Sequence, residues 1–124
     1  PDTPESVVQL YLASIRDDDF ISSYALLSSK QQLHCPLTTL ASQSTNNDVL
    51  RETRVTLKKS EVIGINAFVT VKITTIRNDG LFGTSENSHE ERYPLIKENG
   101  QWRLNGTVWP NLDCLSPTTP LQSN

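Results

Sequence analysis

The stretch from Tyr93 to Trp109, YPLIKENGQWRLNGTVW, decides the fold because Asn99-Gly100 joins two strand-like runs within it. Asn and Gly tolerate positive φ at the two central positions of a type I′ turn, so this pair is the strongest short hairpin signal. Side chains alternate between the two faces of a strand after the turn. This alternation predicts that Trp102 and Leu104 face the core and that Trp109 points to the opposite face.

Two helices are predicted at the start of the chain. Thr3 is expected to cap the first, with Pro4 at its first position, where the missing N–H costs nothing. The apolar residues that recur at helical spacing in it are Val7, Val8, Tyr11, Leu12 and Ile15. The Asp-rich run 17–19 ends this helix, and Asp19 caps a second helix that buries Phe20, Tyr24 and Leu27. Short helical turns are expected at 30–33 and 38–42.

Strand patterns fill the rest of the domain, at about 50–63, 67–76 and 86–98 before the final hairpin. The clearest is the second, whose inward residues are predicted to be Ala67, Val69, Val71 and Ile73. Helices followed by a meander of strands indicate an α+β fold, in which N-terminal helices pack on a strongly curved antiparallel sheet of about four strands.

Length and charge limit the classes of function. The 124 residues predict one domain, residues 1–112, followed by a Pro/Ser/Thr-rich tail, residues 113–124. A net charge of −3 provides no electrostatic footprint for nucleic acid or anionic lipid. The apolar runs are too short to insert into a membrane.

The ends and the cysteines point to a location outside the cytoplasm. The chain begins at Pro1 and contains no Met, so we expect a processed chain that followed a signal peptide, a lipid anchor or a membrane helix. An even cysteine count in an exported domain favours a disulfide between Cys35 and Cys114. The alternative is a pair of buried free thiols.

The chain resembles the nuclear-transport-factor-2-like superfamily, and most of all its bacterial extracytoplasmic branches of unknown function. The resemblance lies in PESVVQLYLASIRDDDFISSYALLS near the start, then GINAFVTVKI, then YPLIKENGQWRL, and covers roughly residues 3–110. It implies a cone-shaped α+β fold, often with a pocket between the first helix and the sheet, and dimerisation through the sheet in many members. It does not imply an activity, since this fold hosts enzymes and non-catalytic modules alike.

Few residues suggest chemistry. The predicted inward strand positions carry no titratable side chain, so no catalytic, metal-binding or cofactor-binding residue is assigned. His34, His89 and the two cysteines match no zinc spacing. The run His89-Glu90-Glu91-Arg92 is expected to be a solvent-facing charge cluster. Tyr11, Tyr24 and Trp102 are the candidates for lining a pocket, with core packing as the alternative.

We therefore interpret the chain as a non-catalytic extracytoplasmic module that binds a protein partner, a small ligand, or its own copy through the sheet. The predicted interaction surface is Phe68, Ile76 and Trp109. The first alternative is a small pocket enzyme of the ketosteroid isomerase or polyketide cyclase type, because a register error of one residue would exchange the two faces of a strand. A second is a domain that spaces or regulates a larger membrane protein.

Overall fold

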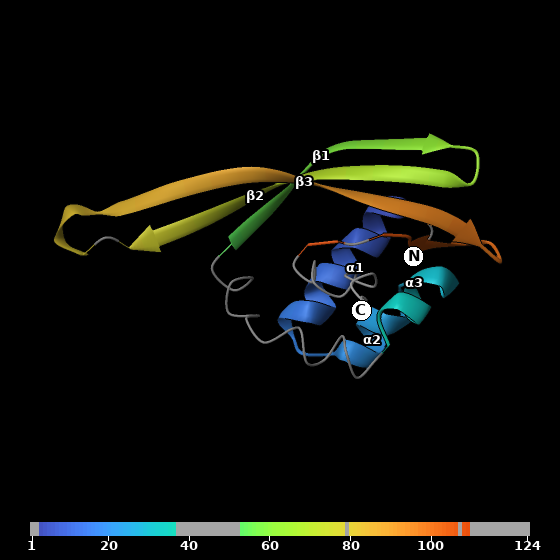
Figure 1. The fold of residues 1–124 in the computed structure, drawn as a ribbon. Coiled ribbons are helices and arrows are strands. Elements are labelled where there is room, and N and C mark those ends of the chain that lie inside the picture. The colour runs from blue at the N-terminus through green and yellow to red at the C-terminus, as the bar shows by residue number, and fades with distance from the viewer. Residues whose placement is uncertain (1–2, 37–52, 79, 107, 110–124) are drawn as a thin grey trace, which may run out of the picture.

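The computed structural model describes residues 3–36, 53–78, 80–106 and 108–109. The elements in this part are α1 (Pro4–Arg16), α2 (Phe20–Ala25), α3 (Ser29–His34), β1 (Thr53–Ile63), β2 (Asn66–Asn78), the short 3-10 helix η1 (Gly80–Phe82), β3 (Thr84–Glu98) and β4 (Gln101–Leu104). The strands form an antiparallel sheet in the order β1-β2-β3-β4. Figure 1 shows the helices together on one side of this sheet. The predicted α+β fold is confirmed.

The helices begin where the sequence indicates, but α2 ends at Ala25. Leu27, predicted to lie in this helix, is buried beyond its end, where it bridges to Leu104 of β4. The Thr3 side chain accepts a hydrogen bond from the Ser6 backbone N–H at 3.2 Å, and Asp19 accepts one from the Ser22 N–H at 3.3 Å. These contacts satisfy N–H groups that have no partner within the helix. The predicted stripe of α1 is buried against the sheet. A hydrogen bond of 2.6 Å joins the Ser14 and Ser23 hydroxyls and fixes α1 against α2.

The sheet is built around the predicted hairpin. Asn99 has φ 52° and Gly100 has φ 81°, as a turn with two left-handed central residues requires. The six residues predicted to face the core are all at most 6% exposed: Ala67, Val69, Val71, Ile73, Trp102 and Leu104. The predicted inward faces of β2 and of β4 are therefore confirmed.

The alternation does not continue to Trp109, because β4 ends at Leu104. The backbone N–H of Leu104 donates to the Leu26 carbonyl at 2.8 Å, so the segment after α2 covers this edge of the sheet. Beyond β4, Trp109 packs against the core on the helix side of the sheet. The prediction that Trp109 points away from the core is wrong, since strand parity holds only while the strand lasts.

Two further features shape the sheet. A β-bulge shifts the register of β1 against β2 between Leu57 and Lys59, and such bulges increase the local twist. The far end of the β2–β3 hairpin extends past the helices (Figure 1).

None of the described helices has the length and the apolar character that spanning a membrane requires. The predicted helical turn at 38–42 and the tail at 113–124 lie outside the described residues.

Candidate functional site

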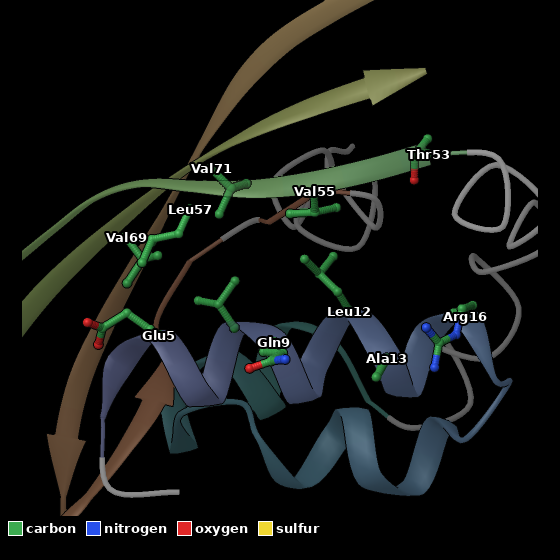
Figure 2. A pocket seen from close by; sticks show the side chains of 11 residues that line it. Glu5, Gln9, Leu12, Ala13, Arg16, Thr53, Val55, Leu57, Val69 and Val71 are labelled. Carbon is green, nitrogen blue, oxygen red and sulfur yellow. The ribbon is translucent and has the colours of Figure 1, made fainter. Parts of the chain in front are cut away.

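A groove of about 550 Å³ lies between α1 and the sheet. Figure 2 shows α1 on one side of the groove and the sheet on the other, where β1 and β2 contribute lining residues. The lining residues are Glu5, Val8, Gln9, Leu12, Ala13 and Arg16 from α1, Thr53, Val55 and Leu57 from β1, and Val69 and Val71 from β2. The volume lies within the range of small-molecule sites. The aliphatic part of the lining, which we call the floor of the groove, consists of Val8, Leu12, Val55, Leu57, Val69 and Val71.

The groove exists because the helices cover β2 but leave β1 partly uncovered. Val55 pairs with Ile73 and Leu57 pairs with Val71, and directly paired residues share a face. Ile73 and Val71 are at most 3% exposed, whereas Val55 is 37% exposed and Leu57 is 53% exposed. Apolar side chains on the helix-facing side of β1 therefore remain accessible to a ligand.

Each end of the groove carries a charged residue of α1. Figure 2 places Glu5 at one end and Arg16 at the other. The Arg16 guanidinium already holds the Asp17 carboxylate, with Nε at 3.0 Å and Nη2 at 3.3 Å from its two oxygens. The hydrogen bond to Asp17 raises the pKa of Arg16. Within the described part of the chain, the Glu5 carboxylate forms no hydrogen bond or ion pair.

The residues predicted to line a pocket lie elsewhere in the fold. Tyr11 and Trp102 are buried in the core, and Tyr24 packs against it partly buried. None of the three belongs to the lining of this groove. The alternative of core packing describes these aromatic side chains better than a pocket does.

A polar pair on β3 was missed by the sequence analysis. Glu91 pairs with Val71 and His89 pairs with Ile73, so both lie on the helix-facing side of the sheet. His89 Nε2 lies 3.0 Å from the Glu91 carboxylate, whose side chain is 24% exposed. The expectation that the whole 89–92 cluster faces solvent is therefore wrong for Glu91. Counting back by twos from the buried Tyr93 would have found this pair.

Two aromatic side chains, Trp109 and Tyr93, lie near the His89–Glu91 pair. The His89 and Trp109 rings lie edge to face, with centroids 6.0 Å apart. The Tyr93 hydroxyl donates to the Trp109 backbone carbonyl at 3.0 Å. The pKa of Tyr93 is raised well above its ordinary range, mainly because the phenol is buried and to a smaller extent because Tyr11 and Glu91 lie nearby. The phenol thus stays protonated and acts as a donor. No cluster of three or more His, Cys, Asp or Glu side chains able to hold a metal occurs among the described residues.

The predicted interaction surface is divided between two faces. Phe68 and Ile76 belong to the face away from the helices, because they alternate with the buried residues of β2. The Arg92 guanidinium lies 4.1 Å from the centroid of the Phe68 ring and covers part of it. Since Trp109 packs on the helix side, the three residues do not form one patch. Self-association through Phe68 and Ile76 stays a prediction.

A different apolar surface lies at the turn between β1 and β2. Val62, Ile63 and Ile65 are each more than half exposed there. Gly64, at φ 63°, supplies the left-handed residue of this turn. This turn lies between the predicted strands 50–63 and 67–76, and no role was predicted for it from the sequence.

Cys35 is buried at the end of α3. No free cysteine occurs among the described residues. Cys114 lies outside them, so the disulfide between Cys35 and Cys114 stays a prediction.

The comparisons with known proteins add a fold and no activity. No protein-family profile and no curated protein matches the chain. A SEC-C motif containing protein from Rhodopseudomonas palustris is similar in structure, with a TM-score of 0.61 and 18% identity, over 84% of this chain and 76% of that one. A protein of unknown function from Mycobacterium tuberculosis is similar with a TM-score of 0.54 and 17% identity, over 81% and 64%. At such identities these likenesses show a shared fold alone.

Proposed function

We propose that this domain is a non-catalytic binding module whose ligand is an apolar small molecule held between α1 and the sheet. The observation that carries the proposal is the aliphatic groove. Its floor is Val8, Leu12, Val55, Leu57, Val69 and Val71. The only titratable side chains in its described lining are Glu5 and Arg16, at its two ends. Proton transfer at the floor of the groove would have no acid or base available.

The test is binding of the neutral fluorophore N-phenylnaphthylamine, measured by its fluorescence. Leu57→Gln removes a half-exposed side chain that lines the groove, and Leu81→Gln changes an almost fully exposed leucine of η1 as the control. Losing about 1 kcal/mol of apolar contact corresponds to roughly fivefold weaker binding. We expect that loss for Leu57→Gln and none for Leu81→Gln. Equal affinities in all three proteins would overturn the proposal.

A second candidate function is acid–base catalysis by the His89–Glu91 pair. A carboxylate beside an imidazole orients the ring, and such a pair can act as the base that abstracts a proton next to a carbonyl. The 3.0 Å contact and the position of Glu91 opposite Val71, a floor residue of the groove, support this candidate.

The catalytic candidate is tested by isomerisation of a β,γ-unsaturated steroid ketone, followed by ultraviolet absorbance. If the candidate is right, the wild type converts the ketone above the buffer rate and Glu91→Gln does not. Glu90→Gln is the matched control, because Glu90 pairs with Lys72 on the other face of the sheet. No conversion by the wild type, or equal loss in both variants, argues against the pair.

We also propose that the chain is a member of the nuclear-transport-factor-2-like superfamily and that it works outside the cytoplasm. The order of helices and strands supports the first proposal, and the absence of a free cysteine among the described residues supports the second. A sequence profile built from close homologues tests the family. Fractionation of the source cells tests the location, and recovery in the cytoplasmic fraction would refute it.

A further inference from the structure

We infer that the ligand of the groove is an elongated small molecule with an aliphatic body and one amino group, bound with its ammonium at Glu5. This inference rests on the proposed function, because it names the chemistry of the molecule that the groove would hold. Two observations carry it: the distribution of charge at the two ends, and the length of the groove along α1.

Charge is unequal at the two ends. At one end Asp17 already occupies two donors of the Arg16 guanidinium, which leaves that end close to neutral. At the other end the Glu5 carboxylate has no partner among the described residues. An anionic ligand would meet Asp17 beside Arg16 and Glu5 at the far end. A cation, in contrast, is attracted by the Glu5 carboxylate. The protein wall beside Glu5 has a lower dielectric constant than water, so it screens this attraction less than water does.

The shape requires an extended molecule. Glu5 and Arg16 are eleven residues apart on α1. A rise of about 1.5 Å per residue separates them by roughly 16 Å along the helix axis. The side chains of α1 between these ends that line the groove are aliphatic except for Gln9. The Gln9 amide offers two N–H donors and one acceptor oxygen near the middle of the groove. The amide is uncharged, so an unbranched alkyl chain can lie beside it without burying a charge.

The experiment compares three ligands that share one alkyl chain: dodecylamine, dodecanol and dodecanoate. Each displaces N-phenylnaphthylamine from the wild type at low salt and below the concentration at which micelles form. We expect the amine to bind more tightly than the alcohol and the carboxylate to bind least. We also expect high salt to reduce the advantage of the amine over the alcohol.

Glu5→Gln identifies the residue responsible. An exposed ion pair supports only about a twofold to fivefold change in affinity. The variant should lose that much for the amine and nothing for the alcohol. The alcohol thus controls for any effect of Glu5 on the first turn of α1. Glu61→Gln is the matched control, because Glu61 is an exposed carboxylate of β1 outside the groove that pairs with Lys59.

The outcomes separate the two claims. If all three ligands bind equally and Leu57→Gln weakens all of them, the groove binds apolar molecules but the inference about the amine is wrong. If dodecanoate binds most tightly, the inference is also wrong. If no ligand binds, or Leu57→Gln has no effect, both the inference and the proposed function fail.

Discussion

Replacing Tyr93 by Phe should weaken the fold at neutral pH and protect it at alkaline pH. Tyr93 lies on β3, is fully buried, and donates its hydroxyl to the Trp109 carbonyl at 3.0 Å. Removing the hydroxyl leaves that carbonyl without its donor, which should cost about 1 kcal/mol of unfolding free energy. This cost is present whenever the phenol is protonated, and therefore at pH 7.

The alkaline effect has the opposite sign. Burial raises the pKa of Tyr93 in the folded state, whereas the unfolded chain titrates near the usual value of about 10. A group whose pKa is higher in the folded state contributes stability below the unfolded pKa and loses that stability as the pH rises above it. The loss approaches about 1.4 kcal/mol for each pH unit above that value. Phe cannot ionise, so the variant lacks this loss.

The two free energies of unfolding should therefore meet at about pH 11, because a cost of about 1 kcal/mol is offset within roughly one pH unit above 10. Urea denaturation followed by circular dichroism, repeated from pH 7 to the alkaline limit of two-state unfolding, measures both curves. Parallel curves over the whole range would refute the argument that Tyr93 is held protonated by its surroundings. A variant as stable as the wild type at pH 7 would refute the hydrogen bond to Trp109.

Three smaller predictions concern single positions. Gly106→Ala would place a Cβ 2.7 Å from Pro94 Cγ, so we expect a loss of about 1–3 kcal/mol in urea denaturation; an unchanged midpoint would show that Pro94 can move aside. Gly100→Ala would put a side chain at φ 81° and should lower the free energy of unfolding by roughly 1 kcal/mol. An unchanged free energy of unfolding would show that the hairpin does not need a glycine at this turn. A bridge between Cys35 and Cys114 predicts no alkylation of the denatured, unreduced chain, and labelling at both cysteines would exclude it.

Local signals in the sequence predicted most of the fold. The caps at Thr3 and Asp19, the Asn99-Gly100 turn and the alternation of β2 each depend on a few neighbouring residues, and all are present in the structure. The end of β4 could not be predicted in the same way. It depends on Leu26 accepting a hydrogen bond from Leu104, a contact between segments far apart in the sequence. Because the alternation of β4 was extended beyond the last residue of the strand, Trp109 was predicted on the wrong face of the sheet.

The family resemblance implied a pocket between the first helix and the sheet, but the residues that line the groove could not be predicted, for a similar reason. Val55 and Leu57 show the alternation of a half-buried strand, and the structure does place them on the helix-facing side. Whether a helix covers such residues is decided by tertiary packing, and here α1 covers Val71 while Leu57 stays half exposed. The bulge after Leu57 also shifts the later residues of β1 by one position. The Glu91 position, by contrast, follows from Tyr93 by simple alternation and could have been predicted.

An NMR titration would locate an apolar ligand held between α1 and the sheet. Amide and methyl signals of the isotope-labelled chain would be followed while dodecylamine is added. We expect saturable shifts at Leu12, Val55 and Leu57, which line the groove, and none at Leu81 on η1. Shifts confined to the exposed turn at Ile63, or no saturable shift at all, would show that the groove does not bind this ligand.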